Sequence, residues 1–492
     1  MQFSQLIRDL PTVATGGNLE NDVRGIAYDS RRVSPGDLFV ALRGEHTDGH
    51  RYISQAFERG AVAALVEEPV EAPCWAQVED TLRALAITAK RLHGDPAADL
   101  SLVGVTGTNG KTTTTYIIEQ IAAAAGVKMG LLGTIEYRWP GHRENAPHTT
   151  PFSSDLHGKL ADMRKSGVTS AVLEVSSHAL DLHRVDTLRF DVGVFTNLTR
   201  DHLDFHGTME NYAASKLRLF TDYLKPGGRA VLNMDDEWGR RYLHHLDRHQ
   251  VITFGFSAEA QVRPEGDIEP DPTGINQVLW TPAGHLLVDS NLIGRHNLMN
   301  IMAAVAACLG LRMEPSRIEA GLQQPMRVPG RLERVDAGQP FTVVVDYAHT
   351  PDGVEKVISA LSEFRPPHLI TVVGCGGDRD RKKRPMMAGI AQNLSSLVIL
   401  TSDNPRTEDP ERILDEMEAG MLGNRGASYL RLADRREAIH KAIAVAGKGD
   451  IVLIAGKGHE TYQEIQGVRH PFDDREVALE ALAARGHARG KA

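Results

Sequence analysis

A glycine- and threonine-rich stretch, VGVTGTNGKTTTT (residues 103–115), constrains this sequence more than any other feature. It lies between an apolar run at residues 102–105 and a helix-like stretch at residues 113–125. The backbone N–H groups of such a loop, together with the N-terminus of the following helix, can hold phosphate oxygens. In this interpretation Lys111 meets the β- and γ-phosphates, and the Thr112 hydroxyl binds Mg²⁺.

The stretch departs from the strict P-loop pattern at one position. A valine, Val105, stands where that pattern has glycine, and the glycine is found at Gly107 instead. A turn that only joins a strand to a helix is the alternative, but the lysine and threonines that follow favour nucleotide binding. The predicted nucleotide-binding residues of the loop are Gly107, Thr108, Asn109, Gly110, Lys111, Thr112 and Thr113.

Apolar runs alternate with helical patterns along most of the chain. In the middle part they include residues 170–175 and 192–196, and towards the C-terminus they are residues 342–346, 369–373, 397–401 and 451–455. This alternation predicts an α/β protein with doubly wound, largely parallel sheets, whose ligands bind beyond the carboxyl ends of the strands. The length of 492 residues suggests about three domains.

We expect the domains to span residues 1–97, 98–328 and 329–492. The first contains strand patterns at residues 38–42 and 62–66 with a helix-like stretch at 50–59 between them. It ends in HGDPAADL, whose glycine, proline and aspartates predict a linker.

Composition narrows the classes of function. The net charge of −9 argues against a general polyanion binder, so we expect no nucleic-acid partner. The three cysteines are far apart, which excludes a disulfide framework and a cysteine zinc site. The N-terminus lacks the pattern of a signal peptide, and the apolar runs are too short to cross a membrane. These features predict a cytoplasmic protein.

Ten motifs, in order, resemble those of the Mur ligase family. They are DSRRVSPGDLFVAL, TGTNGKTTTT, HTTP, EVSSHAL, TNLTRDHLDFHG, GRHNLMN, DYAHTPD, GCGGDRDRKKRP, DNPR and AGKGHE. The resemblance covers nearly the whole chain. It implies a central P-loop mononucleotide-binding domain, a Rossmann-like C-terminal domain, and ATP-dependent addition of an amino acid to a UDP-linked muramoyl dipeptide, a peptidoglycan precursor. ATP phosphorylates a carboxylate of the precursor, and the amine then displaces phosphate.

The resemblance also implies a metal site with Mg²⁺. Its ligands are Thr112, Glu174, His202 and Lys216, the last as an N6-carboxylated lysine, and Lys111, His202 and Lys216 act in catalysis. Without the resemblance, Lys216 is a solvated helix lysine, Glu174 a surface charge and His202 a structural histidine. A zinc site at His202 and His206 would need more ligands than this stretch supplies. Further ATP-binding positions are Asn297, Asn300, Arg331 and Asp346, although asparagines also cap helices and arginines also cover surfaces.

Two further groups of positions match the substrate sites of the family. The precursor is expected at Ser30, Glu45, His46, Thr47, Thr149, Thr150, Ser176 and Arg184. His148 and Leu182 depart from well-known Gram-negative members, which have Asn and Gln there, and a leucine cannot form a hydrogen bond. The amino acid is expected at Arg379, Asp403, Asn404, Pro405, Arg406, Gly456 and Glu460.

Arg406 predicts which amino acid is added. Its planar guanidinium suits a carboxylate, and meso-diaminopimelate carries a second carboxylate at its distal end, whereas lysine carries none. Glu460 would pair with the distal ammonium. An exposed turn at DNPR without a ligand is the alternative.

Several other functions remain open. They are a lysine-adding ligase of the same family, a folylpolyglutamate synthetase, a P-loop phosphotransferase and an ATP-gated binding module. A folylpolyglutamate synthetase normally has no domain of this size before the loop, and a phosphotransferase leaves DNPR and AGKGHE unexplained. We expect a monomer.

Overall fold

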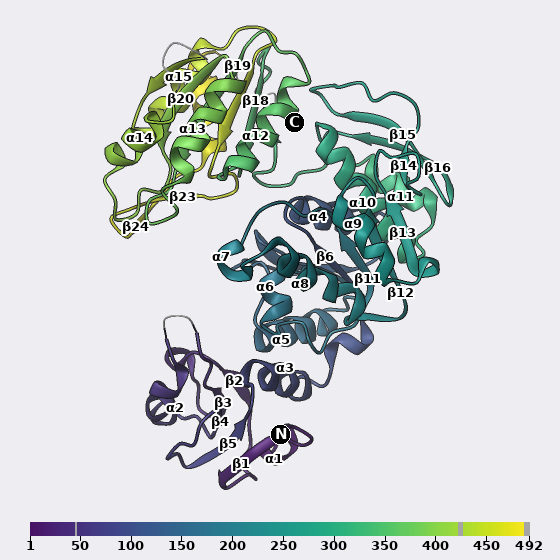
Figure 1. Cartoon of the computed structure of the whole chain (residues 1–492), viewed down its shortest axis with the longest axis vertical. Helices are drawn as coiled ribbons and strands as arrows, with labels where there is room; N and C mark the ends of the chain where they lie inside the picture. The colour runs from purple at the N-terminus through teal and green to yellow at the C-terminus, as the bar shows by residue number, and fades with distance from the viewer. Residues whose placement is uncertain (45–46, 422–426, 487–492) are drawn as a thin grey trace. The chain divides into compact units, whose positions relative to one another are not determined.

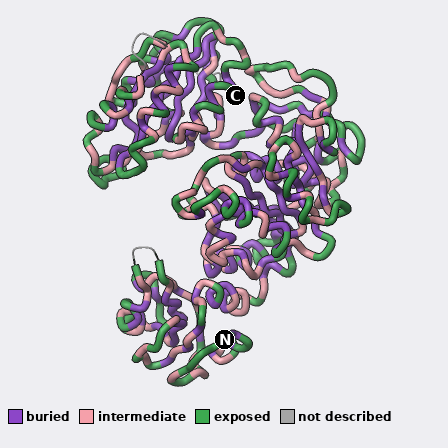
Figure 2. Tube along the Cα trace, viewed as in Figure 1, coloured by how far each residue is buried: buried purple, intermediate pink, exposed green. Residues whose placement is uncertain are grey.

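The computed structural model describes residues 1–44, 47–421 and 427–486. The chain forms two compact units. Unit 1 consists of Met1–Pro264, Leu279–Leu286 and Asn300–Gly321, and unit 2 consists of Glu265–Val278, Leu287–Met299 and Leu322–Ala492. Figure 1 labels many of the helices and strands, and Figure 2 shows that buried residues are concentrated along the strands and the helices that cover them.

A five-stranded sheet occupies the N-terminal part of unit 1, with strand order β1-β5-β4-β3-β2. Alternate residues of its parallel strands face two separate apolar clusters, one shared with α1 and α3 and the other with α2. The elements are α1 (Phe3–Leu6), β1 (Thr12–Gly17), β2 (Gly25–Ala27), η1 (Ser30–Arg32), β3 (Asp37–Val40), η2 (Gly49–Tyr52), α2 (Ile53–Glu58), β4 (Ala63–Val66), β5 (Cys74–Val78), α3 (Thr81–Leu92) and η3 (Pro96–Asp99).

An eight-stranded sheet follows, with strand order β13-β12-β11-β6-β10-β7-β8-β9. The strands from β13 to β7 are parallel, and β8 and β9 form an antiparallel edge. The elements are β6 (Ser101–Thr106), α4 (Lys111–Ala124), β7 (Met129–Leu132), β8 (Glu136–Trp139), β9 (His142–Asn145), α5 (Ser153–Lys165), β10 (Ser170–Glu174), α6 (Ser177–Asp181), β11 (Phe190–Phe195), α7 (Leu203–His206), α8 (Met209–Thr221), β12 (Leu224–Asn233), α9 (Glu237–Tyr242), η4 (Leu243–His245), η5 (Arg248–Gln250) and β13 (Val251–Phe254).

A three-stranded sheet and two helices come next in the chain. They are β14 (Arg263–Pro264), β15 (Ile275–Thr281), β16 (Gly284–Ser290), α10 (Arg295–Gly310) and α11 (Pro315–Leu322).

Unit 2 contains a six-stranded sheet with order β17-β18-β22-β19-β20-β21, parallel except for β17. Helices α12, α13 and α14 pack on one face and α15 and α16 on the other, as in a doubly wound fold. The elements are β17 (Glu333–Arg334), β18 (Thr342–Asp346), α12 (Pro351–Ser362), β19 (Leu369–Cys375), α13 (Lys383–Leu394), β20 (Leu397–Ser402), α14 (Pro410–Glu418), β21 (Ser428–Arg431), α15 (Arg435–Val445), β22 (Ile451–Ala455), β23 (Tyr462–Ile465), β24 (Val468–Pro471) and α16 (Asp474–Ala484).

The predicted α/β class with doubly wound parallel sheets is confirmed, with local differences. The helix expected at residues 50–59 begins as the 3₁₀ turn η2 and becomes α-helical only at Ile53. The stretch HGDPAADL is an ordered turn rather than a plain linker, because Pro96 starts the 3₁₀ helix η3 and Ala97 is buried. Proline suits the first position of a helix, which explains why this segment takes helical form.

Candidate functional site

The phosphate loop lies between β6 and α4. Gly107 has a φ of +145°, and a Cβ atom there would lie 1.9 Å from the Thr196 hydroxyl oxygen. Gly110 has a φ of +86°, and a Cβ atom there would lie 2.4 Å from the Asn300 side-chain oxygen. Both positions therefore need glycine. Since Gly110 is the N-cap of α4 and has no side chain, the first N–H groups of that helix face a possible anion.

The loop is held by the segment that follows β11. The Asn109 N–H donates to the Asn197 side chain at 2.9 Å, and the Thr199 N–H donates to the Thr108 hydroxyl at 3.0 Å. The Lys111 ammonium donates to the Gly107 and Thr108 carbonyls at 2.8 and 2.9 Å. Phosphate oxygens can replace these carbonyl acceptors, so the loop is arranged for a nucleotide in advance.

Glu174 is the last residue of β10, and in the sheet it is the register partner of Val105 in the phosphate-loop strand β6. Its side chain is buried, and its two oxygens accept from the Thr134 N–H and hydroxyl, both at 2.9 Å. Both of these groups of Thr134, which hydrogen-bond to the Glu174 carboxylate, are neutral. A buried carboxylate without a cation is costly, so this position is suited to a metal ion.

Lys216 is fully buried on α8, with its ammonium 3.1 Å from the Gly107 carbonyl oxygen and 4.5 Å from the centre of the Tyr212 ring. Burial, and secondarily the charge of Lys111, hold the pKa of Lys216 well below its ordinary value. The interpretation of Lys216 as a solvated helix lysine is therefore wrong. This side chain and Lys111 share the Gly107 carbonyl, which places both amines at the phosphate loop.

His202 stands at the N-cap of α7 with a φ of +52°. Its ring packs edge-on against the His178 ring, and burial lowers its pKa, with Lys111 and Lys216 adding to the effect. His206 has a different environment, because its Nε2 atom lies 2.9 Å from the Ser177 hydroxyl and its Nδ1 atom lies 3.3 Å from Asp181. His206 is thus a hydrogen-bonded structural residue. The charge of Lys216 acts on both histidines, whereas that of Lys111 acts on His202.

The residues expected to bind the precursor peptide meet beyond β10. The Thr150 hydroxyl accepts from the Ser176 N–H at 3.1 Å, and the Arg184 guanidinium donates to the Thr150 carbonyl at 2.8 Å. Thr149 contacts the Thr134 hydroxyl at 3.1 Å, which links the group to Glu174. Ser176 caps α6 through its hydroxyl oxygen.

The environment of Arg184 is suited to binding an anion. Its guanidinium lies 4.0 Å from the centre of the Phe152 ring, and burial lowers its pKa. Within the described part of the chain, its buried Nε atom has no hydrogen-bond partner. An unsatisfied buried donor on a cation is the kind of group that a carboxylate ligand can complete.

The structure describes only some of the N-terminal positions that are expected to bind the precursor. Ser30 begins η1 and donates its hydroxyl to Gln55 at 2.7 Å, and the Thr47 carbonyl accepts from the Gly44 N–H at 2.9 Å. Glu45 and His46 lie outside the described residues.

Asp48, His50 and Glu68 lie close enough to resemble a metal site. However, the His50 Nδ1 atom lies 2.6 Å from Asp48, and its Nε2 atom accepts from the Glu67 N–H at 2.8 Å. Both ring nitrogens are thus occupied in holding the loop to the end of β4, and this group is structural.

Of the positions expected to bind ATP, Asn297 and Asn300 lie on α10, Asp346 ends β18, and Arg331 precedes β17. The Asn297 amide donates to the Ile293 carbonyl at 2.8 Å. The Asp346 oxygens accept from the Leu332 and Ala348 N–H groups at 2.7 and 2.8 Å. Burial raises the pKa of Asp346, and the charge of Arg331 opposes this shift.

The DNPR segment follows β20 and is not an exposed turn, because Asp403, Asn404 and Pro405 are all buried. A Cβ atom at Gly456, directly after β22, would lie 2.4 Å from an Asp403 carboxylate oxygen. The Asn404 amide donates to a Glu460 carboxylate oxygen at 2.8 Å. The structure therefore brings these predicted residues together at the ends of two strands.

Arg406 is held by its backbone and its side chain. Its φ is +52°, its N–H donates to the Glu464 carbonyl at 3.0 Å, and its carbonyl accepts from the Gln466 N–H at 2.6 Å. Its guanidinium donates to the Gly377 carbonyl at 2.6 Å. The β23–β24 hairpin thus fixes the direction in which Arg406 points.

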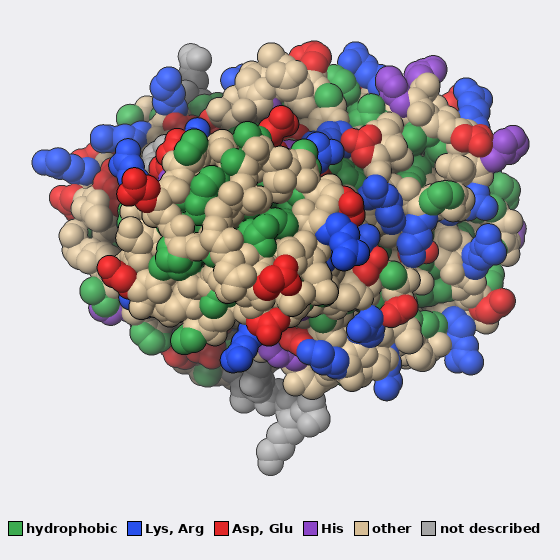
Figure 3. Space-filling view, turned by 90° about the horizontal axis from the view of Figure 1, so that it is seen from below, with side chains coloured by type: hydrophobic (Ala, Val, Ile, Leu, Met, Phe, Trp, Pro, Cys, Tyr) green, Lys and Arg blue, Asp and Glu red, His purple; other side chains and the backbone are tan. Residues whose placement is uncertain are grey.

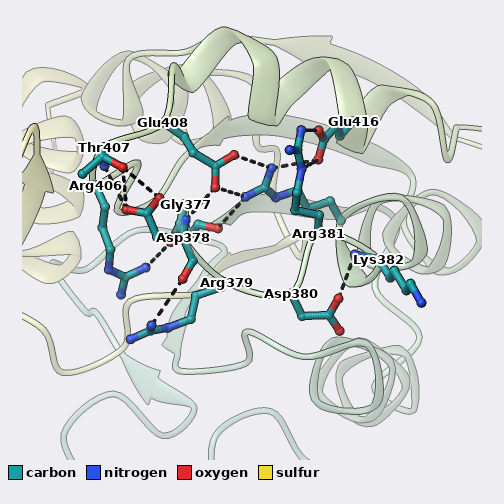
Figure 4. A network of polar contacts seen from close by, with 12 residues as sticks. Gly377, Asp378, Arg379, Asp380, Arg381, Lys382, Arg406, Thr407, Glu408 and Glu416 are labelled. Carbon is teal, nitrogen blue, oxygen red and sulfur yellow. Dashed lines mark hydrogen bonds and ion pairs between the residues drawn. The ribbon is translucent and has the colours of Figure 1, made fainter. Parts of the chain in front are cut away.

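Figure 4 shows how the loop that carries Arg379 is joined to the loop that carries Arg406. The Asp378 carboxylate accepts from the Thr407 N–H and hydroxyl, and the Glu408 carboxylate accepts from the Asp378 N–H. Arg379 itself is exposed, and its guanidinium lies 3.3 Å from the Asp378 carbonyl.

Arg384 completes this network from α13. Its side chain is fully buried and donates to the two Glu408 oxygens at 2.7 and 3.0 Å and to Glu416 at 2.8 Å. Arg384, Glu408 and the buried Lys457 are not among the site residues predicted from the sequence. Lys457 lies between Gly456 and Glu460 in AGKGHE, so its position in that motif was the one available signal.

Basic and acidic side chains are interspersed over the face drawn in Figure 3, so anion binding depends on local sites such as the phosphate loop. In the described ranges, no helix is both long and apolar enough to cross a membrane.

Comparison with known proteins shows which family the chain belongs to. Three family models match: "Mur ligase family, catalytic domain" over residues 22–93, "Mur ligase middle domain" over 105–308 and "Mur ligase, glutamate ligase domain" over 330–458. A UDP-N-acetylmuramoyl-L-alanyl-D-glutamate–2,6-diaminopimelate ligase of Geobacter metallireducens is 47% identical, covering 99% of this chain and 100% of the relative. The protein of the same name from Geobacter sulfurreducens is 46% identical, covering 98% and 99%.

A solved structure with that name is 34% identical to the chain, with a TM-score of 0.72, and the match covers 99% of this chain and 100% of the other. These matches extend over nearly the whole length of this chain and of each relative. The chain therefore belongs to the Mur ligase family.

Proposed function

We propose that the chain is an ATP-dependent amide ligase that adds meso-diaminopimelate to the D-glutamate carboxylate of UDP-N-acetylmuramoyl-L-alanyl-D-glutamate. The shared name of the full-length relatives supports this substrate pair. The observation that carries the proposal is the Arg406 guanidinium, held by the Gly377 carbonyl, in the same segment as Asn404, whose amide binds Glu460. A cation and an anion held in one pocket suit the distal carboxylate and ammonium of diaminopimelate.

The phosphate loop supplies the ATP site in this proposal. The N–H groups from Gly107 to Thr113 and the Lys111 ammonium hold the phosphates, and Asn297, Asn300, Arg331 and Asp346 contact the rest of the nucleotide. Bound Mg²⁺ would neutralise phosphate charge during transfer to the precursor carboxylate. Its proposed ligands are the Thr112 hydroxyl, Glu174 and His202, and the buried carboxylate of Glu174, bound to neutral groups, supports that assignment.

We propose that Lys216 is N6-carboxylated. The ammonium first loses one proton. The neutral amine then adds to carbon dioxide, so that a C–N bond forms, one C=O π bond becomes a carboxylate, and a second proton is released, which turns a buried cation into an anion. The complete burial of the amine and its depressed pKa favour the neutral form that this reaction needs. The anion produced would join Glu174 and His202 as a metal ligand.

Precursor binding is proposed for two groups of residues. Arg184, with its buried unsatisfied Nε atom, binds a carboxylate of the dipeptide, and Thr149, Thr150 and Ser176 line the same place. The UDP part is proposed to bind at Ser30, Glu45, His46 and Thr47. Arg379, Asp403, Pro405, Arg406, Gly456 and Glu460, with Asn404, receive the amino acid.

The proposed reaction forms an acyl phosphate on the precursor, which the amine of the amino acid attacks, releasing phosphate and forming the amide. The enzyme is proposed to act as a monomer, with domains at residues 1–97, 98–328 and 329–492. Lys111 in the phosphate loop counters the negative charge that collects when two anions approach, and Arg331 is proposed to add positive charge where it contacts the nucleotide.

Phosphate release tests the proposal. With ATP, Mg²⁺ and the UDP-linked dipeptide, sustained release should require meso-diaminopimelate as well, because turnover ends only when the amine attacks. A P-loop phosphotransferase would turn over without any amine. Release that is independent of diaminopimelate would contradict the ligase proposal.

A further inference from the structure

Lys457 is a buried cation in the proposed amino-acid pocket. Its side chain is 0% exposed, and its ammonium donates to the Asn404 side-chain oxygen and to a Glu460 carboxylate oxygen, both at 3.0 Å. The ammonium also lies 5.5 Å from the centre of the Tyr462 ring. A lysine is rarely buried to this extent unless it is paired, so its position points to a specific task.

The backbone on either side of Lys457 directs its side chain inwards. Gly456 has a φ of +117° and Gly458 a φ of +53°, conformations that L residues rarely adopt. Cβ atoms at these glycines would lie 2.4 Å from an Asp403 oxygen and 2.7 Å from the Tyr347 Cβ atom. The turn after β22 is therefore packed closely on both sides of the lysine.

Lys457 fixes the orientation of the Asn404 amide. The Asn404 oxygen accepts from the Lys457 ammonium and from the Glu464 N–H, the latter at 2.9 Å. Its nitrogen must then face the other way, where it donates to Glu460 at 2.8 Å. Because ammonium and N–H groups only donate, a reversed amide would lose both contacts.

Lys457 also fixes Glu460. The Lys457 ammonium and the Asn404 amide both bind the Oε2 atom of Glu460. Among the described residues, the structure assigns no hydrogen bond to the other oxygen, Oε1. Glu460 is therefore held through one oxygen while the second can accept from a ligand.

We infer that Lys457 is a specificity-determining positioning residue, which orients Asn404 and Glu460 and rejects amino acids whose distal end carries an ammonium alone. The inference rests on the proposed function and names a new determinant of its amino-acid pocket. Lys457 already balances the charge of Glu460, so a ligand with a lone distal ammonium adds an uncompensated positive charge. The distal end of diaminopimelate carries a carboxylate as well as an ammonium and so adds no net charge. Lys457 therefore discriminates against a lone distal ammonium by electrostatic repulsion, in addition to orienting the residues that contact diaminopimelate.

The test compares wild type with Lys457→Met, which keeps the length of the side chain and removes its charge and donors. We expect KM for meso-diaminopimelate to rise roughly tenfold to a hundredfold, as for the loss of hydrogen bonds to a charged group. We also expect the ratio of kcat/KM for diaminopimelate to that for L-lysine to fall at least about tenfold, because the repelling charge is gone. KM for ATP should not change.

A matched control separates positioning from stability. Thr371 is buried in β19, and its hydroxyl lies 2.8 Å from the Ser395 hydroxyl. Thr371→Val removes this hydrogen bond from the same sheet and should lower Tm while leaving the selectivity ratio unchanged. Lys457→Arg, which restores a buried cation, should recover part of the selectivity that Lys457→Met loses.

The possible results separate the inference from the proposed function. Wild-type enzyme that fails to turn over with diaminopimelate would overturn the proposed function. Wild-type turnover with an unchanged selectivity ratio in Lys457→Met would overturn the inference alone. If Lys457→Met does not fold, Lys457→Gln gives the same comparison because it also removes the charge, and an unchanged selectivity ratio in folded Lys457→Gln would overturn the inference.

Discussion

Individual residues in this chain adopt conformations that only their surroundings can hold. Arg406 and His202 both have φ values of about +52°, although neither is glycine. Such backbones cost free energy and persist where neighbouring groups fix them, as the β23–β24 hairpin fixes Arg406. Both residues lie in predicted sites, which agrees with the tendency of strained backbones to cluster at functional positions.

The phosphate loop gives a prediction for one glycine. Gly107→Ala places a methyl group on the Thr196 hydroxyl, so the loop must shift, and we expect ATP affinity to fall at least about tenfold with a stability loss of roughly 1–3 kcal/mol. Gly126→Ala is the control, because Gly126 has a φ of +76° but nothing within 4 Å of its Cβ position. Calorimetric titration with ATP should show unchanged affinity for Gly126→Ala, and equal affinity for both variants would refute the role of Gly107.

The sequence predicted which polar residues lie at strand ends, but it did not predict which charged side chains are buried. Glu174 and Asp346 were selected correctly as strand-end carboxylates, since an acidic residue at the end of an apolar run is a visible pattern. The burial of Lys457 and Arg384 was not predicted. The presence of a lysine or arginine in the sequence does not show whether its side chain is exposed or buried, because this depends on tertiary packing.

Two loops of unit 2 act together as one element. Residues 376–382 and 403–409 follow β19 and β20 and are joined through Asp378, Thr407 and Glu408, with Arg384 beneath them. This joining places Arg379 and Arg406 on one rigid support, which is how a recognition site gains precision.

Arg384→Gln should therefore be strongly destabilising. It leaves the carboxylates of Glu408 and Glu416 without their buried partner, a loss of about 3–5 kcal/mol. Arg431→Gln is the control, since Arg431 binds three carboxylates from a more exposed position and its loss should cost less than about 1 kcal/mol. Urea unfolding monitored by circular dichroism measures both, and equal losses would contradict the account.

The environment of Glu408 predicts that the free energy of unfolding depends on pH in the acidic range. Its hydrogen bonds from Arg384, and next in order the Asp378 N–H, lower the pKa of Glu408 from 4.5 to about 2 against the opposing effect of burial. A carboxyl whose pKa is lowered by folding stabilises the protein above pH 4.5, and this contribution is lost as the pH falls towards 2. Glu408→Gln should thus show a smaller loss of unfolding free energy over that range. Parallel curves for wild type and variant would exclude the contribution.

The sequence predicted the strands best where both faces of a strand are buried. The runs at residues 342–346 and 451–455 coincide with β18 and β22, because parallel strands covered on both faces are continuous apolar runs. The short strands β23 and β24 were not predicted, since their sequences YQEI and VRHP are largely polar and contain no buried residue. Their role depends on the tertiary contact with Arg406, which no local pattern encodes.

At the scale of the molecule, three sheets carry the proposed chemistry. The alternation of strands and helices predicted this class of fold, and full-length relatives share it. The compact units do not follow the chain in order, because residues 265–278 and 287–299 belong to unit 2 while residues 279–286 and 300–321 belong to unit 1. Such interleaving depends on contacts between distant segments, so a linear sequence pattern does not reveal it.

We propose that the chain joins diaminopimelate to a UDP-linked muramoyl dipeptide and selects it through Arg406. The most direct measurement is mass spectrometry of the product formed from ATP, Mg²⁺ and the precursor, with meso-diaminopimelate or L-lysine as the amine, for wild type and Arg406→Ala. We expect the diaminopimelate tripeptide to be the dominant wild-type product, and we expect that preference to be lost in the variant. Equal yields of the lysine and diaminopimelate products from the wild type, or an unchanged preference in Arg406→Ala, would contradict it.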